Sequence, residues 1–113
     1  DYYNEYFLNN ENIISLKNNY YCAYHIYIIK LNLEKINKTR DDVFKELKEA
    51  KIGVNVHYIP IHTHPYYQKL GFKDGDFPNS EYYYSGAISL PLFHTMTLEQ
   101  QDEVVSNLGR ILI

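Results

Sequence analysis

The sequence has 113 residues, the usual length of one domain, and a net charge of -3 with acidic and basic residues interspersed. It therefore lacks the basic field that neutralises nucleic-acid phosphates, and we expect no nucleic-acid partner despite its 13 tyrosines. It also lacks the apolar run of about 18 residues that a membrane span needs. Cys22 is the single cysteine, which excludes an internal disulfide, and we expect a cytoplasmic location and no membrane partner.

The start of the chain carries a helical pattern. Tyr3, Phe7 and Leu8 recur at helical spacing within residues 2–8, and an Asn-rich turn follows. Because the chain begins without Met and inside this pattern, we expect it to be a piece of a longer polypeptide. We assign residues 1–19 to the tail of a helix and a linker, and residues 20–113 to one domain.

A strand and a helix are predicted next. Residues 24–29 are β-branched or aromatic on both faces, which predicts a strand buried on its two sides and a structural role for His25. Thr39 followed by Asp42 is a capping-box pattern, and the apolar stripe after it stops at Gly53. We therefore expect a helix directly after Thr39.

Residues 53–58 alternate between apolar and polar side chains, which predicts a second strand that ends at Pro60. The side chains expected to face the core are those of Val54, Val56 and Tyr58. Asn55 and His57 would then point to the opposite side.

The second half of the chain predicts short helices, a strand and a longer helix. Pro65 suits the first position of a short helix, and Asn79 or Ser80 could cap another one. Residues 87–90 predict a strand, and the capping-box pattern that begins at Thr97 predicts the last helix. The order indicates an α/β (α+β-like) fold, with helices against a sheet of few strands.

Three histidines within eight residues, His57, His62 and His64, raise the hypothesis of a metal site. Their spacing matches no common zinc motif, and the other interpretation is that they bind backbone groups or substrate. Asp76 and Glu81 could form an acid pair, but their loop setting is more typical of caps and solvated charge. A His-dependent metalloenzyme thus stays open as a minor alternative.

The segment at residues 53–62, GVNVHYIPIH, followed by Pro65-Tyr66-Tyr67, resembles the signature of the DegT/DnrJ/EryC1/StrS family of sugar aminotransferases. Further elements agree with that family in their order, from Thr39-Arg40-Asp41 to Ser89-Leu90-Pro91-Leu92 and the last helix. The resemblance covers residues 20–113. Within the family, the sequence of this segment is most similar to that of the transaminase that makes UDP-4-amino-4,6-dideoxy-N-acetyl-beta-L-altrosamine for pseudaminic acid biosynthesis.

The resemblance implies the small C-terminal domain of a fold-type I aminotransferase, with a mainly antiparallel sheet packed against helices. It implies a large domain, missing from this chain, that carries pyridoxal phosphate (PLP) on a lysine. None of the nine lysines here has the family's Ser/His/Phe-rich setting, so we expect the isolated chain to bind no PLP covalently and to be inactive. The parent would be a homodimer that moves an amino group, usually from glutamate, to a nucleotide-linked keto-sugar.

Under this resemblance the chain's own task is to position the substrate. The expected binding groups are the side chains of Asn55, His57 and Tyr58 and a backbone amide near Val56. Alternatively, His57 ties the strand end to the loop and Tyr58 fills the core. The main rival hypothesis is a non-enzymatic binding or interaction domain, which would have a self-sufficient surface. A piece of an aminotransferase should instead expose an apolar patch on its first helix or around Tyr20 and Tyr21, where the missing domain or a second subunit would dock.

Overall fold

The computed structural model describes residues 2–14, 16 and 22–113. The chain forms helices and strands in the order α1 (Tyr2–Phe7), β1 (Ile13–Ile14), β2 (Tyr27–Leu31), α2 (Arg40–Glu49), the 3-10 turn η1 (Ile61–Thr63), α3 (Pro65–Lys69), α4 (Pro78–Gly86), β3 (Ala87–Leu90) and α5 (Leu98–Ile111). None of the helices in these residues is long and apolar enough to cross a membrane.

The sheet has three strands in the order β1-β2-β3, and both neighbouring pairs are antiparallel. Ile13 lies opposite Leu31 at one edge of β2, and Tyr27 lies opposite Leu90 at the other. The predicted class is therefore confirmed: a small α+β unit with an antiparallel sheet of few strands against helices.

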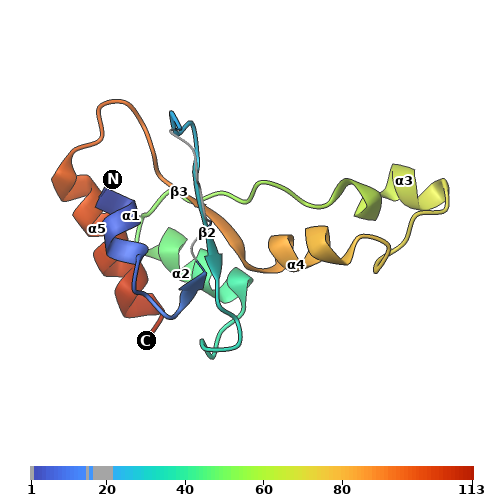
Figure 1. Cartoon of the computed structure of the whole chain (residues 1–113), viewed down its shortest axis with the longest axis horizontal. Coiled ribbons are helices and arrows are strands. Elements are labelled where there is room, and N and C mark those ends of the chain that lie inside the picture. The colour runs from blue at the N-terminus through green and yellow to red at the C-terminus, as the bar shows by residue number, and fades with distance from the viewer. Residues whose placement is uncertain (1, 15, 17–21) are drawn as a thin grey trace.

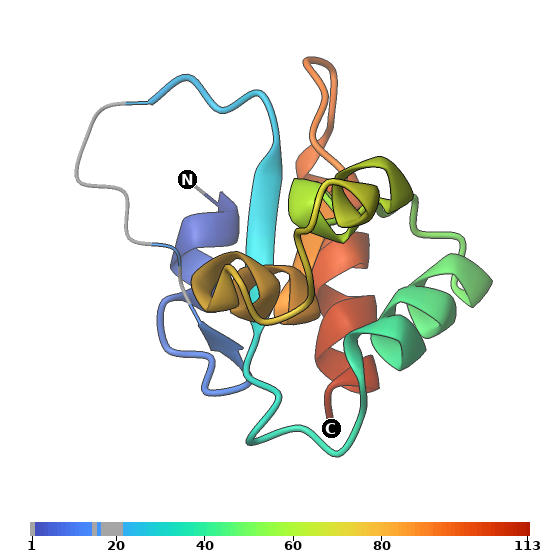
Figure 2. The ribbon, with the colours of Figure 1, turned by 90° about the vertical axis from the view of Figure 1, so that its right-hand side faces the viewer.

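Helices α1, α2 and α5 supply the core beside the sheet (Figure 2). Both predicted capping boxes are formed, since the Thr39 hydroxyl accepts from the Asp42 N–H and the Thr97 hydroxyl accepts from the Gln100 N–H, each at 3.2 Å. The central apolar side chains come from several elements and include Phe7, Ile29, Leu31, Val43, Leu47, Ile88, Val104, Val105 and Leu108. Residues from both ends of the chain thus share one core.

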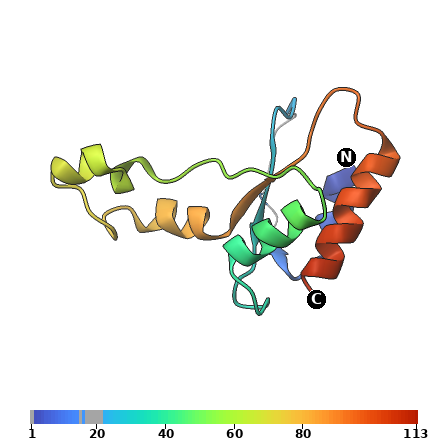
Figure 3. The same cartoon turned by 180° about the vertical axis from the view of Figure 1, so that it is seen from behind.

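Residues 58–86, here called the arm, extend away from this core and carry η1, α3 and α4 (Figure 1 and Figure 3). The extension makes the molecule elongated, with principal extents of 48 × 33 × 25 Å. At the root of the arm, an Arg40 guanidinium N–H donates to the Tyr84 carbonyl at 3.2 Å, and the Lys30 ammonium lies 2.9 Å from the centre of the Tyr82 ring. These contacts attach α4 to α2 and β2.

Two predicted strands differ from the observed ones. The first begins at Tyr27 and continues to Leu31, so His25 is exposed before it and has no buried structural role. Residues 53–58 form no strand, because only Asn55 pairs with β3, through an isolated bridge to Ser89. Tyr58 is 74% exposed rather than part of the core.

The start of α4 was also predicted wrongly. The helix begins at Pro78 after Phe77, which makes no side-chain capping bond, so neither Asn79 nor Ser80 is the cap. Proline is pre-organised for the first helical turn, and here that preference outweighs the capping preference of the two residues after it.

Candidate functional site

The predicted site residues follow one another where the chain passes beside β3, after α2, and enters the arm. Asn55 is fixed by its backbone: its N–H donates to the Ser89 carbonyl at 3.2 Å, and the Ser89 N–H donates to the Asn55 carbonyl at 2.8 Å. The Asn55 side-chain oxygen accepts from the Val56 N–H at 2.8 Å. A ligand would therefore have to break this internal hydrogen bond before it could bind the Val56 N–H or the Asn55 side-chain oxygen.

His57 is half-buried, and its Nδ1 lies 2.7 Å from the buried Ser89 hydroxyl oxygen. The Tyr58 ring meets the His57 ring edge-on, with centroids 4.5 Å apart, and the peptide bond between the two residues is cis. Within the described ranges, the His57 side chain makes no other hydrogen bond. The exposed Tyr58 side chain thus packs against an imidazole whose Nε2 makes no hydrogen bond within the described residues.

The three histidines of the metal hypothesis do not converge on one site. His57 binds Ser89, His62 Nε2 lies 2.6 Å from Glu81 Oε1, and His64 is exposed. Over the part of the chain that the structure describes, no group of three or more His, Cys, Asp or Glu side chains could hold a metal ion. The metalloenzyme alternative therefore gains no support.

Glu81 is a structural acceptor within the arm. It accepts from His62 and, at 2.7 Å, from the Gly75 N–H, and these bonds hold the pKa of the Glu81 carboxyl below its ordinary value. Asp76 instead accepts from the Lys73 N–H at 2.9 Å. The two acids therefore bind separate partners in the arm rather than forming an acid pair, and Glu81 lies in the first turn of α4 instead of the predicted loop.

The lysines with the most restricted surroundings are already engaged, which bears on whether this chain could anchor PLP. Lys30 is only 6% exposed and lies over the Tyr82 ring. Lys38 donates to Glu46 at 2.8 Å and to the Ile111 carbonyl at 2.7 Å. Neither amino group suits a Schiff-base anchor, which needs a free amine beside the cofactor. Lys17 lies outside the described residues.

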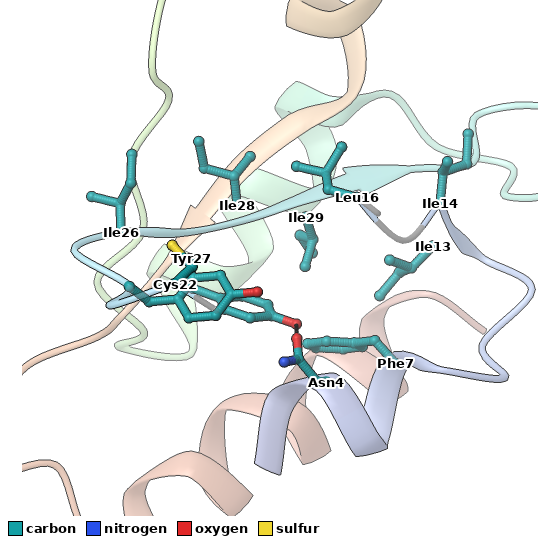
Figure 4. A pocket seen from close by; sticks show the side chains of 11 residues that line it. Asn4, Phe7, Ile13, Ile14, Leu16, Cys22, Ile26, Tyr27, Ile28 and Ile29 are labelled. Atoms are coloured by element: carbon teal, nitrogen blue, oxygen red, sulfur yellow. Dashed lines mark hydrogen bonds between the residues drawn. The ribbon is translucent and has the colours of Figure 1, made fainter. Parts of the chain in front are cut away.

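An apolar hollow of about 270 Å³ lies between α1, β1 and β2 (Figure 4). Figure 4 shows Phe7, Ile13 and Ile29 in its wall, and the Tyr27 phenol donates to Asn4 at 2.6 Å. Among the described residues in its wall, the titratable side chains are those of Cys22, Tyr24 and Tyr27, and the remaining side chains are apolar apart from Asn4. It does place apolar surface beside the first helix, whereas Tyr20 and Tyr21 lie outside the described residues.

The sequence model of the DegT/DnrJ/EryC1/StrS aminotransferase family matches residues 1–109. The uncharacterized protein MJ1066 of Methanocaldococcus jannaschii is 40% identical over 113 residues, which cover 97% of this chain and 29% of that protein. The spore coat polysaccharide biosynthesis protein SpsC of Bacillus subtilis is 44% identical over 85 residues, which cover 74% of this chain and 22% of SpsC.

Solved structures of aminotransferases are also similar to this chain. Spr1654 of Streptococcus pneumoniae, whose structure is titled "Putative sugar aminotransferase" and is in the PMP form, is 26% identical with a TM-score of 0.82, and the match covers 96% of this chain and 28% of that one. PseC of Helicobacter pylori, an aminotransferase of pseudaminic acid biosynthesis, shares the fold, with a TM-score of 0.83, 24% identity, and coverage of 97% of this chain and 30% of PseC.

The chain thus spans less than a third of the length of the relatives it matches. Its matching region holds the antiparallel sheet, the arm and residues 55–58 together. The chain belongs to the DegT/DnrJ/EryC1/StrS family of PLP-dependent aminotransferases.

Proposed function

We propose that this chain is the C-terminal part of an aminotransferase that moves an amino group from glutamate to a nucleotide-linked 4-keto-6-deoxy sugar. In this proposal residues 20–113 are the small domain, and residues 1–19, whose α1 and β1 pack on its core and sheet, lead into it from a large domain. Family membership supports the reaction class. The observation that carries the role of this chain is His57, whose Nδ1 is held by Ser89 while its Nε2 makes no bond within the described ranges.

The proposed role is to position the nucleotide sugar. His57 Nε2 and the Tyr58 phenol can form hydrogen bonds with both parts of such a ligand. The diphosphate oxygens accept hydrogen bonds, and the sugar hydroxyls can donate or accept them. The Tyr58 ring also offers an apolar face on which a sugar or a base can pack. Asn55 and the Val56 amide contribute after their mutual hydrogen bond opens. Fixing the substrate in this way lowers the entropic part of the barrier for a reaction at a neighbouring centre.

PLP, when bound to the parent enzyme, supplies the electron sink for amino transfer. We place its lysine in the large domain, and the engagement of Lys30 and Lys38 with other groups supports that placement. The isolated chain should therefore be inactive. We further propose that the parent acts as a homodimer in the cytoplasm, where the free and exposed thiol of Cys22 stays reduced.

Binding of UDP-N-acetylglucosamine to the purified chain, followed by ligand-detected NMR, tests the positioning role. We expect weak binding that His57→Ala and Tyr58→Ala each reduce. Tyr66→Ala is the matched control, because Tyr66 is similarly exposed, at 67%, but lies in α3 near the end of the arm. Equal binding by His57→Ala and the unmodified chain would contradict the proposal, and so would the absorbance of lysine-bound PLP after PLP is added to the chain.

A further inference from the structure

Ser89 is a polar side chain in a strand whose residues are all buried. It is 5% exposed, and its neighbours Ile88 and Leu90, at 0% and 4%, belong to the hydrophobic core. Because side chains alternate along a strand, Ser89 points to the face opposite Ile88 and Leu90. A buried hydroxyl is costly unless it is hydrogen-bonded, so its partner identifies its use.

That partner is the His57 imidazole. The Ser89 Oγ lies 2.7 Å from His57 Nδ1 and makes no other hydrogen bond within the described ranges. If the hydroxyl accepted from an Nδ1–H group, its own proton would have no acceptor there. Donation by the hydroxyl to a bare Nδ1 satisfies both groups, and it leaves the proton of the neutral ring on Nε2.

We propose that Ser89 is a positioning residue: it holds the His57 ring in the Nε2–H tautomer and aims this N–H at an acceptor oxygen of the ligand. This inference rests on the proposed function for the identity of the ligand, a nucleotide sugar whose diphosphate and hydroxyl oxygens accept hydrogen bonds. The orientation of the ring itself follows from the contact with Ser89 alone.

The backbone around Ser89 makes this role separable from a structural one. Its N–H and carbonyl pair with Asn55, and these two bonds do not involve the hydroxyl. Ser89→Ala should therefore keep the loop attached to β3 while it releases the ring. Ser85→Ala is the matched control, because the exposed Ser85 hydroxyl donates to the Tyr82 carbonyl at 2.8 Å and does not contact His57.

The test combines long-range ¹H–¹⁵N spectra of the imidazole nitrogens with the affinity for UDP-N-acetylglucosamine, both measured on the 113-residue chain. His57→Ala assigns the His57 signals. We expect the Nε2–H tautomer to dominate in the unmodified chain and in Ser85→Ala. In Ser89→Ala it should give way to a mixture of tautomers, and the affinity should fall about three- to tenfold, the usual effect of one lost hydrogen bond.

An unchanged His57 spectrum in Ser89→Ala would overturn the inference, and so would a dominant Nδ1–H tautomer in the unmodified chain. If the tautomer changes as expected but the unmodified chain binds no nucleotide sugar, the proposed function fails while the positioning of His57 by Ser89 stands. If Ser89→Ala does not fold, Ser89→Cys carries the test, because its thiol fills the position of the hydroxyl with a larger atom but is only a weak donor.

Discussion

Gly86, the last residue of α4, packs directly against the central strand of the sheet. A Cβ atom at this position would lie 2.9 Å from the Leu31 carbonyl oxygen and 3.3 Å from the Lys30 side chain. Gly109 in α5 offers a matched comparison, since a Cβ there would also meet one atom at 2.9 Å, the hydroxyl of Tyr6. The two positions differ in whether that neighbouring atom can move.

The Leu31 carbonyl belongs to β2, which is paired on both sides, so it cannot retreat without disturbing the sheet. Overpacking of this kind costs about 1–3 kcal/mol, whereas Ala gains at most about 1 kcal/mol over Gly in a helix. We therefore expect Gly86→Ala to lower the free energy of unfolding by about 1–2 kcal/mol. Tyr6 is 40% exposed and its hydroxyl is the end of a rotatable side chain, so Gly109→Ala should be neutral or stabilising by up to about 1 kcal/mol.

Urea unfolding followed by circular dichroism measures both variants. A lower midpoint with an unchanged slope for Gly86→Ala, beside an equal or higher midpoint for Gly109→Ala, is the expected result. Equal losses in the two variants, or a Gly86→Ala variant as stable as the unmodified chain, would refute the reasoning that backbone contact decides the sign.

Two pH effects follow from the hydrogen bonds and the burial. Hydrogen bonds from His62 and from a backbone N–H stabilise the Glu81 carboxylate and lower its pKa from the ordinary value of 4.5. Their contribution to the free energy of unfolding is therefore fully present above pH 4.5 and is lost as the pH falls through the lowered pKa. Glu81→Gln should remove this acid dependence from the urea midpoint, and an identical pH profile would contradict the assignment. Burial raises the pKa values of Tyr3 and Tyr27 to about 12, because it favours the neutral phenols. The free energy of unfolding therefore keeps their full contribution below pH 10.0 and decreases as the pH rises from 10.0 to about 12. Tyrosinate absorbance should show a late phase that Tyr3→Phe reduces; ionisation of all tyrosines near the ordinary value would contradict it.

The features predicted correctly from the sequence depend on neighbours in the chain. Thr39 and Thr97 each cap a helix through a residue three positions later, a relation that the sequence displays directly. Strand β3 was found because its four apolar or small residues end at Pro91. The strand β1 has two residues and gives no periodic signal, so its pairing with β2 could not be anticipated.

The wrong strand at residues 53–58 shows what local alternation leaves open. The alternation is real at first, since Val54 is buried and Asn55 is exposed. A strand also needs a partner along its whole length, and β3 offers only the bridge at Ser89 before the chain departs into the arm. Tyr58 therefore lies beyond the sheet and is exposed, which removes the alternative that it fills the core.

The partners of the histidines were equally inaccessible to sequence spacing. His62 meets Glu81 across 19 positions, and His57 meets Ser89 across 32. The contact of His62 with Glu81 exists because the outgoing and returning legs of the arm run side by side (Figure 1). The contact of His57 with Ser89 exists because the chain is bridged to β3 at Asn55, just before the arm begins. One signal was present: a serine within an otherwise apolar buried strand requires a polar partner.

The two histidine contacts stabilise different regions, one within the arm and one at its root beside the sheet. The contact of His62 with Glu81 joins the two legs within the arm, where the Phe77 ring packs against the His62 ring with their centroids 4.8 Å apart. The contact of His57 with Ser89 lies at the root, where the backbone bridge between Asn55 and Ser89 is anchored in the sheet. Because the bridge fixes the root independently of the outer contact, Glu81→Gln should leave the His57 tautomer unchanged. The geometry of the proposed binding residues is therefore a property of the sheet edge rather than of the arm.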